Sequence, residues 1–574
     1  MDTESATYTE SQVETIHDGA TPSKHEFSEN RLPLESDLEA VSAPKETPDS
    51  STVVIQAEEQ NFGPKTPLTT ARRNLVFFAI GVTLFLSALD QTIVSTTLPA
   101  VAKDFNDFAD ISWVGTAYLI STTAVQPIYG TMADMFGRKR SMLFASAIFL
   151  IGSALCGASQ SMIMLIISRA VQGLGGSGIV TLSMILVADI VPLRERGTYQ
   201  AFVASIYAAA AVLGPLLGGA FADHVSWRWA FYINLPIGAV ASVFIISFLH
   251  MNRRKNVSLL TNLMSLDFSG IFLLVVSIVM ILLGLNWGAD AKYAWNSAVV
   301  LSLLIVGAAL GLLFLLNEGK HAQKPIIPLR LFKSLSLILV YVCIFLQGFI
   351  FLSLMFFLPL YFQAVHGASA TQSGVGVIPF VITQAACAVI AGLLMSRWGI
   401  YKEFIVAGWT IGSISGGLLT IIDENTSKGV VVVILLLEGV SQGLTVTTLL
   451  LAIHAQLESK ADIALGTSLW TFLRTLGGVF GVAIGSVFVQ DSLSNAGASQ
   501  YAQNIKAIAD LPEEIKGPIL AAFMGGIKKL FILLEVFSGI CFLSSLFIKK
   551  VTMGSKQQKQ DGEEESSPTI LLAE

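Results

Sequence analysis

The chain has 574 residues, of which 53% are hydrophobic and only 13% are charged, and its formal net charge is −6. Soluble domains carry roughly one quarter charged residues, so this composition excludes a soluble globular protein and indicates one embedded in a membrane. Most of the acidity lies in the first 70 residues, which hold 14 acidic and four basic residues. The net charge therefore gives no information about binding partners.

The segment 1–73 predicts a disordered, acidic cytosolic tail. Ser, Thr, Pro and Glu dominate it, and it contains no apolar run that could form a core. It does not resemble a signal peptide, because its first ten residues are acidic and no apolar segment follows them. The segment 551–574, which includes Asp561 and Glu563, predicts a second cytosolic tail.

Fourteen apolar runs follow the N-terminal tail, each close to the length of about 20 residues that a helix needs to cross a bilayer. They cover 75–98, 111–134, 141–158, 162–189, 199–222, 229–250, 268–287, 296–316, 338–364, 372–396, 403–422, 429–454, 463–490 and 527–548. With the N-terminus inside, the inner segments receive 19 basic residues and the outer segments eight. This bias places both tails in the cytosol.

An internal repeat supports the division of these runs into two halves. GTMADMFG at 130–137 corresponds to GLLMSRWG at 392–399, and RAVQGL at 169–174 corresponds to EGVSQGL at 438–444, at offsets of about 265 residues. Parallel halves of this kind indicate a transporter that binds its substrate between them. The predicted parts are a six-helix bundle at 74–250, two linker helices at 251–337, and a second six-helix bundle at 338–550 with an outer loop at 491–526.

Six motifs occur in the order expected of one family. They are LDQTIVSTTLP at 89–99, GTMADMFGRKR at 130–140, RAVQGLGGSG at 169–178, AAVLGPLLGG at 210–219, WRWAFYINLPIG at 227–238 and RTLGGVFG at 474–481. Through these motifs the chain resembles the major facilitator superfamily over about 74–550, and within it the fourteen-spanner drug:proton antiporter branch found in fungi. The resemblance implies an all-α integral membrane fold of 14 transmembrane helices, arranged 6 + 2 + 6, with two pseudo-symmetric six-helix bundles.

The turn after the second run carries the motif residues Gly130, Asp134, Gly137, Arg138 and Lys139. A carboxylate at a helix end beside basic groups can hold the two halves together and release them, and the resemblance implies such a gating role. The general excess of Lys and Arg in cytosolic loops, the positive-inside rule, explains Lys139 equally well. The second half has a serine where Asp134 stands in the first.

Small residues and a proline interrupt the run 199–222. Gly214, Gly218 and Gly219 allow another helix to approach closely, and Pro215 removes a backbone hydrogen bond. Helix packing alone accounts for this pattern. The resemblance adds that the motif is typical of antiporters, although Ala210 stands where the pattern has its first glycine.

Four charged residues lie deep within the predicted spans: Asp90, Arg169, Glu438 and Arg474. Each costs several kcal/mol in a bilayer unless it is paired or faces a cavity, so a functional role is the default interpretation. Counted from the ends of their helices at ~1.5 Å per residue, Asp90 and Arg169 lie at similar depths in the membrane. Glu438 and Arg474 also lie at similar depths. The resemblance places Asp90 and Arg169 on helices that line the cavity.

We therefore expect proton coupling at these four residues, with Asp90 as the carrier. Burial favours the protonated carboxyl and a nearby arginine favours the charged one, so Asp90 can bind and release a proton as the cavity changes side. Glu438 is the second candidate, with a static Glu438–Arg474 ion pair as the structural alternative. A fifth membrane charge, Glu535, is expected to be structural.

Amide and aromatic side chains on the expected cavity helices suit a bulky, mostly apolar ligand. Packing or lipid contact is the alternative for most of them. The candidates are Gln91, Gln126, Gln347, Phe351, Tyr361, Gln384 and Gln442, together with Phe357 and Gln363.

Several other functions have no support in the sequence. GLGGSG at 173–178 matches a dinucleotide-binding pattern but lies inside an apolar run, and no ATP-binding P-loop occurs. The four cysteines, all in apolar segments, are expected to be buried hydrophobes rather than disulfides or metal ligands. We expect neither an enzyme nor a cofactor; a proton gradient supplies the energy.

The predicted function is a proton-coupled efflux antiporter that exports hydrophobic drugs, toxins or secondary metabolites by rocker-switch alternating access. We expect a monomer in the plasma membrane, or alternatively the vacuolar membrane, with no nucleic acid partner. Uptake or vacuolar transport of a siderophore or amino acid is the alternative within transport, and a non-transporting membrane sensor is the alternative outside it. The motif at 210–219 favours export.

Overall fold

The computed structural model of the chain describes residues 70–551 except 108–109, 251–266, 290–292, 321–324, 458, 499–500, 502–507 and 509–511. These residues belong to one compact unit. The predicted tails, apart from residues 70–73 and Val551, lie outside the described residues, as does part of the predicted outer loop.

Each apolar run of the sequence forms a helix, because only a helix satisfies all of its own backbone hydrogen bonds where water is absent. The first group consists of α1 (Thr70–Phe105), α2 (Ser112–Phe136), α3 (Arg138–Gly157), α4 (Met162–Ile190), α5 (Arg196–His224), α6 (Trp229–Tyr232) and α7 (Asn234–Phe248). Then come α9 (Phe268–Ala289), α10 (Ala298–Lys320) and the 3₁₀ turn η1 (Leu329–Phe332). The second group consists of α11 (Leu335–His366), α12 (Ala370–Trp398), α13 (Lys402–Leu419), α14 (Lys428–Gln456), α15 (Lys460–Asn495) and α16 (Glu513–Phe547).

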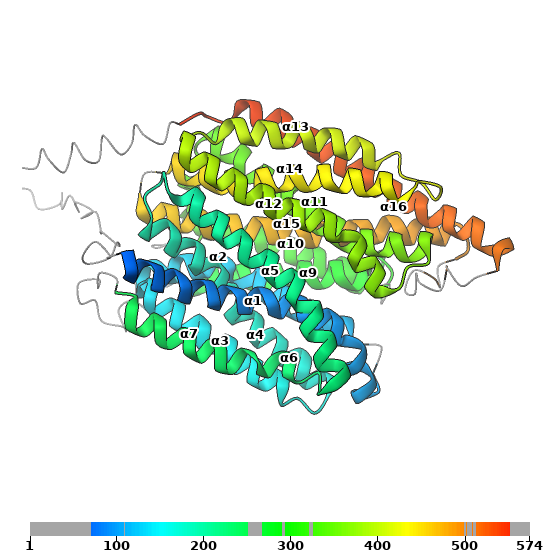
Figure 1. The fold of residues 1–574 in the computed structure, drawn as a ribbon, viewed down its shortest axis with the longest axis horizontal. Coiled ribbons are helices and arrows are strands. Elements are labelled where there is room, and N and C mark those ends of the chain that lie inside the picture. The colour runs from blue at the N-terminus through cyan, green and yellow to red at the C-terminus, as the bar shows by residue number, and fades with distance from the viewer. Residues whose placement is uncertain are drawn as a thin grey trace, which may run out of the picture. The chain divides into compact units, whose positions relative to one another are not determined.

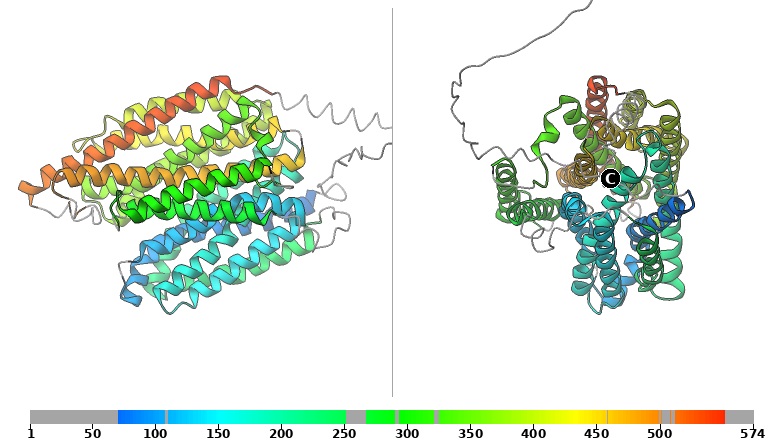
Figure 2. Two further views of the ribbon diagram at one scale, coloured as in Figure 1. Left: turned by 180° about the vertical axis from the view of Figure 1, so that it is seen from behind. Right: turned by 90° about the vertical axis from the view of Figure 1, so that its left-hand side faces the viewer.

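The two groups form two helical bundles that lie side by side (Figure 1). In the first, α1 packs on α5 and α7, and α4 packs on α2 and α3. In the second, α11 packs on α15 and α14 packs on α12 and α13. The pair α9–α10 lies along the boundary between the bundles, where α9 contacts α2 and α15 (Figure 2).

Twelve helices of the described chain are long and apolar enough to cross a membrane, with α6 and α7 counted as one span. The predicted count of fourteen spans is not confirmed. The two long helices outside the twelve are α2 and α13. Ser, Thr and Gln lower the hydropathy of α2, and α13 is short and rich in Gly and Ser.

Two elements differ from their predicted limits. The helix α16 begins at Glu513, inside the segment predicted as an outer loop, because its first turns have an apolar face of their own. Ile519, Phe523 and Met524 on that face are buried. The predicted span 229–250 is divided at Ile233 into α6 and α7.

The bundles contact each other near the end that carries the α2–α3 turn. On one side of the boundary, Thr198 of α5 donates through its hydroxyl to Ser396 Oγ of α12 at 3.1 Å. One turn away, the backbones of Gly197 and Gly392 approach so closely that neither position has room for a Cβ atom. The helices of the two bundles diverge toward the opposite end, at the right of Figure 1.

The other side of the same boundary is formed by α15 against α2 and α4. Gln126 Nε2 donates to Thr475 Oγ1 at 3.2 Å, and the hydroxyls of Thr181 and Thr471 lie 3.3 Å apart. These polar contacts and the α5–α12 contact close one end of the boundary between the bundles.

Candidate functional site

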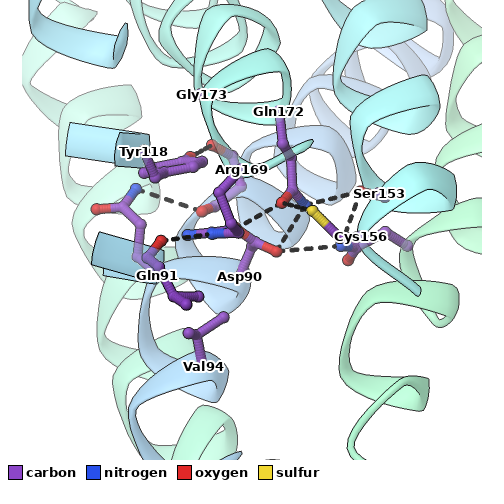
Figure 3. A network of polar contacts seen from close by, with 12 residues as sticks. Asp90, Gln91, Val94, Tyr118, Ser153, Cys156, Arg169, Gln172 and Gly173 are labelled. Carbon is purple, nitrogen blue, oxygen red and sulfur yellow. Dashed lines mark hydrogen bonds and ion pairs between the residues drawn. The ribbon is translucent and has the colours of Figure 1, made fainter. Parts of the chain in front are cut away.

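Asp90 lies at the centre of a buried polar network in the α1–α7 bundle (Figure 3). Its Oδ2 accepts from Arg169 Nη1 at 2.5 Å, and its Oδ1 accepts from Gln172 Nε2 at 2.7 Å and from Asn234 Nδ2 at 3.4 Å. The Asp90 side chain has no exposed surface. The prediction that Asp90 and Arg169 lie together is confirmed. The expectation that Asp90 lies on the wall of a cavity is wrong for this conformation, in which the side chain is fully buried.

Besides its bond to Asp90 on α1, Arg169 is held by residues of α2 and α4. Its Nε donates to the carbonyl of Val114 at 3.1 Å, and its Nη1 also donates to Gln172 Oε1 at 2.6 Å. The guanidinium lies over the ring of Tyr118, 4.3 Å from the centroid, as a cation–π contact. These contacts offset part of the cost of burying the cation.

A second layer of hydrogen bonds orients the donors around Asp90. Ser153 of α3 accepts from Gln172 Nε2 at 2.8 Å and from Asn234 Nδ2 at 3.2 Å. The helices α3 and α4 can approach there because residue 152 is glycine, whose Cβ would lie 2.5 Å from the Cα of Gln172. The network therefore joins α1, α2, α3, α4 and α7, and any movement of Asp90 affects most of the bundle.

Sequence reasoning did not identify the three additional polar members of this network. A signal existed for two of them, since Gln172 follows Arg169 by three residues in RAVQGL and Asn234 belongs to WRWAFYINLPIG. Ser153 had no signal, because a single serine in an apolar run is common. The network surrounds the Asp90 carboxylate with donors from two other helices, α4 and α7.

Glu438 and Arg474 do not form the ion pair that was the structural alternative to a coupling role. Glu438 points toward α13, where it accepts from Ser415 Oγ at 2.5 Å, and from Gln442 Nε2 on its own helix at 3.2 Å. The structure describes no cation bonded to it, although its side chain is only 1% exposed. The position of a residue along its helix gives its depth in the membrane but not the direction of its side chain. Similar depths therefore did not mean that Glu438 and Arg474 are in contact.

Arg474 points toward α11 instead. Its Nε donates to Gln347 Oε1 at 3.1 Å, and the guanidinium lies 5.0 Å from the ring centroid of Phe351 and 5.8 Å from that of Trp470. Tyr207 of α5, in the other bundle, is close enough to interact with it electrostatically. Arg474 therefore lies between α15 and α11, which pack on each other.

The predicted substrate residues divide into two sets. Gln347 and Phe351 contact Arg474, and Gln126 bonds to Thr475, so these three gather at the boundary between the bundles. The others have separate surroundings. Gln91 is exposed beside Asp90, Gln442 donates to Glu438, and Tyr361 donates to the carbonyl of Asp423. Gln363 donates to Ser373, the backbone of Gln384 lies against α14, and Phe357 is packed in the core.

The turn between α2 and α3 is held by ion pairs within its own bundle. Gly137 adopts φ 89°, a left-handed conformation that favours glycine. Arg138 is buried and pairs with Asp134 and, at 2.7 Å, with Asp189 at the end of α4. Lys139 Nζ donates to the carbonyl of Ile246. The sequence analysis did not identify Asp189 as a partner of Arg138. It is the last residue of the predicted run 162–189, three residues before Pro192.

Gly130, the first residue of this motif, lies at the boundary itself. A Cβ atom there would collide with the hydroxyl of Ser468 on α15. The first residue of the motif, Gly130, therefore lies at the contact between the bundles. Its last residues, Arg138 and Lys139, lie at a turn that contacts with α4 and α7 hold in place.

The small residues of α5 pack against the helix that carries Asp90. Cβ atoms at Gly214 and Gly218 would collide with the side chains of Thr92 and Thr96 on α1, whereas one at Gly219 would have no neighbour within 4 Å. Thr92 Oγ1 also donates to the carbonyl of Ala210 at 3.0 Å. The helix continues through Pro215. Two of the three glycines therefore set the distance between α1 and α5.

No group of three or more His, Cys, Asp or Glu side chains suited to a metal ion occurs among the residues that the structure describes. The four cysteines are unpaired, and three of them are buried.

Known proteins resemble the chain over most of its length. A family model described as Major Facilitator Superfamily matches residues 80–482. The MFS-type efflux pump LUC4 of Fusarium sp is 36% identical, over 88% of this chain and 92% of that protein. The MFS-type transporter of the acurin A biosynthesis cluster in Aspergillus aculeatus is 39% identical, over 77% of this chain and 79% of that protein.

A solved structure has a similar fold. The crystal structure of the human organic anion transporter MFSD10 (TETRAN) aligns with a TM-score of 0.54 at 18% identity, covering 82% of this chain and 100% of that one. At this identity the likeness concerns the fold alone.

Proposed function

This chain belongs to the Major Facilitator Superfamily, and from that membership we propose that it is an antiporter which exports hydrophobic drugs, toxins or secondary metabolites in exchange for protons. Its relatives include named efflux pumps and a transporter of a secondary-metabolite cluster, which supports export. The family and these relatives identify a transporter of small molecules rather than an enzyme. We place it in the plasma membrane with both tails in the cytosol.

The buried ion pair between Asp90 and Arg169 carries the proposal of proton coupling. A carboxylate and a guanidinium with at most 2% exposure are costly to keep in a membrane protein, and intramembrane charges of this kind mark ion pathways. Asp90 accepts hydrogen bonds on both of its oxygens in the present conformation. In the proposed cycle, α1 separates from α4, Arg169 leaves the carboxylate and a proton takes its place.

Alternating access is supported by where the two bundles meet. The contacts of Thr198 with Ser396 and of Gln126 with Thr475 lie toward the end that carries the α2–α3 turn, and the bundles diverge toward the other end. The first contact consists of two hydrogen bonds, from the backbone N–H and the hydroxyl of Thr198, and the second of one, each worth about 1 kcal/mol. Such contacts can break and reform as one bundle rocks against the other.

Fourteen spans remain the topology that we propose. The helix α2 has 25 residues, and α13 has 18, which at ~1.5 Å per residue nearly equals a hydrocarbon core of ~30 Å. Both lie within the bundles, where α2 packs between α4 and α15 and α13 between α14 and α16. A helix covered by neighbours needs less apolar surface than one facing lipid.

The proposal is tested by transport in reconstituted vesicles. The full chain is first expressed in a yeast strain without its own drug pumps, and a panel of hydrophobic toxicants identifies a compound to which it gives resistance. That compound is then followed in proteoliposomes under an imposed pH gradient. We expect movement that depends on the gradient and is lost in Asp90→Asn. Resistance without any effect of the gradient would overturn proton coupling.

A further inference from the structure

The guanidinium of Arg474 has hydrogen-bond donors that the protein does not use. Within the described residues its one hydrogen bond is the one from Nε to Gln347, and no carboxylate lies within ion-pair distance. Both Nη groups are therefore without a protein acceptor. By contrast, Arg169, the other arginine deep within a predicted span, is paired with a carboxylate.

Two neighbours of Arg474 are also donors without acceptors. Gln347 gives its oxygen to Arg474, which leaves Gln347 Nε2 buried and unbonded, and its side chain has no exposed surface. The indole Nε1 of Trp470 is likewise buried and unbonded, with the side chain 6% exposed. Leaving a buried donor such as these two unsatisfied costs about 1–3 kcal/mol. A ligand that supplies acceptors, and negative charge above all, would remove this cost.

Arg474 lies next to residues of α15 that contact the other bundle. Thr471 and Thr475, which flank it on α15, bond to Thr181 and Gln126 of the other bundle. Tyr207 approaches it from α5. Arg474 thus lies at the boundary between the halves, where transporters with parallel halves bind their substrates.

Aromatic rings surround the cation. Phe351 and Trp470 lie 5.0 and 5.8 Å from the guanidinium, measured to the ring centroids, and the buried ring of Phe380 supports Phe351 from 5.9 Å. A flat apolar molecule can stack on such rings while its acidic group reaches Arg474.

We propose that Arg474 binds the carboxylate, or an equivalent acidic group, of the exported molecule, with Gln347 and Trp470 as additional donors. The substrates of this chain are then aromatic organic acids in their ionised form, rather than neutral hydrophobic compounds. The inference rests on the proposed export function and specifies its substrate class. It replaces the role in proton coupling that the sequence suggested for Arg474.

Binding to the purified full chain in lipid nanodiscs tests the inference, with 1-naphthoate as the acidic probe and 1-naphthamide as its neutral counterpart. We expect the wild type to bind naphthoate more tightly than naphthamide. Arg474→Gln should weaken naphthoate binding by about 10- to 100-fold, the effect of losing a charge-assisted hydrogen bond, and leave naphthamide binding unchanged. The matched control is Arg228→Gln, which removes an arginine also stacked on an aromatic ring, but exposed and already paired with Asp104.

A second variant keeps the test decisive if Arg474→Gln folds poorly. Gln347→Glu places a carboxylate next to Arg474 from within the protein. We expect it to raise the melting temperature, to abolish naphthoate binding and to retain naphthamide binding, because the internal carboxylate takes the place of the ligand.

The inference is overturned if the wild type binds both probes equally, or if either variant weakens both to the same extent. Failure of the proposed function has a different signature. In that case the wild type still binds naphthoate, but proteoliposomes do not move it in response to a pH gradient.

Discussion

Asp90 on α1 and Arg169 on α4 form an ion pair of 2.5 Å in which neither side chain is more than 2% exposed. The two residues are 79 positions apart in the sequence, and their contact holds α1 against α4 inside one bundle. Gln172 and Asn234 supply the remaining donors to the carboxylate. A proton on Asp90 would compete directly with Arg169, which connects a protonation event to the packing of helices.

Replacement of Asp90 by Asn should remove proton coupling without unfolding the chain. Asn keeps the size of Asp and an oxygen that can accept from Gln172, but it cannot bind a proton. We expect pH-driven transport to disappear while exchange of substrate across the vesicle membrane without a gradient continues. Glu438→Gln, the same change at the other buried carboxylate, is the control and should keep coupling. The opposite pattern in the two variants would assign the proton to Glu438.

Arg169 and Asp90 should be energetically coupled in a double-mutant cycle. Arg169→Gln leaves a buried carboxylate without its cation and should lower the free energy of unfolding by about 3–5 kcal/mol. The double variant Asp90→Asn with Arg169→Gln should lose less than the sum of the single variants, with a coupling of about 0.5–3 kcal/mol. Denaturant unfolding of the purified protein measures these differences.

An exposed pair provides the comparison for this cycle. Arg73 and Glu195 lie 3.7 Å apart with 32% and 52% of their side chains exposed. Because solvent screens such a pair, Arg73→Gln should change the free energy of unfolding by at most about 1 kcal/mol. Strict additivity at Asp90 and Arg169 would contradict the importance of their contact.

The glycines of α5 should differ sharply in their tolerance of a methyl group. Gly218→Ala would place a Cβ against the side chain of Thr96 and 2.5 Å from the carbonyl oxygen of Ile93, so α1 and α5 must separate. We expect a loss of about 1–3 kcal/mol in stability, as for other overpacked sites, together with reduced transport. Gly219→Ala, one residue further, has no neighbour within 4 Å and should leave both unchanged. Melting temperature and vesicle transport measure the two effects, and equal effects of the variants would refute this interpretation.

A disulfide across the contact of Thr198 with Ser396 should lock the bundles together. Their hydroxyl oxygens lie 3.1 Å apart on α5 and α12, beside the close contact of Gly197 with Gly392. We expect oxidation of the double variant Thr198→Cys with Ser396→Cys to stop transport, and reduction to restore it. Each single variant should transport under both conditions. Continued transport by the oxidised, cross-linked protein would show that this contact does not open during the cycle.

Asp104, beyond the spanning part of α1, should make a contribution to stability that depends on pH. The hydrogen bonds that Arg228 and Trp227 donate hold the pKa of this carboxyl below its ordinary value. Since the folded pKa is the lower one, the stabilisation is present above the unfolded value of about 3.9 and is lost as the pH falls through the folded value. Asp104→Asn should therefore lower the melting temperature equally at pH 7 and at pH 5 but hardly at all in strong acid. A loss that increases as the pH falls would contradict this assignment.

Composition and short motifs were enough to predict that the chain lies in a membrane, where its helices are and to which family it belongs. Each of these depends on the composition of a continuous segment or on a short motif, and both can be read without knowing any contact. The Asp90–Arg169 pair was also predictable, because charges are rare in the spans and the family resemblance placed both on cavity helices.

The rotation of each helix about its own axis, and therefore which side chains meet, could be seen only in the folded chain. In a membrane the lipid-facing side of a helix is as apolar as the buried side, so no polar face indicates how the helix is turned. Depth alone therefore paired Glu438 with Arg474, whereas the fold points Glu438 at Ser415 and Arg474 at Gln347. The rotation of α15, which packing fixes and the sequence does not predict, also determines the surroundings of Arg474. It leaves this cation with unused donors at the boundary between the bundles.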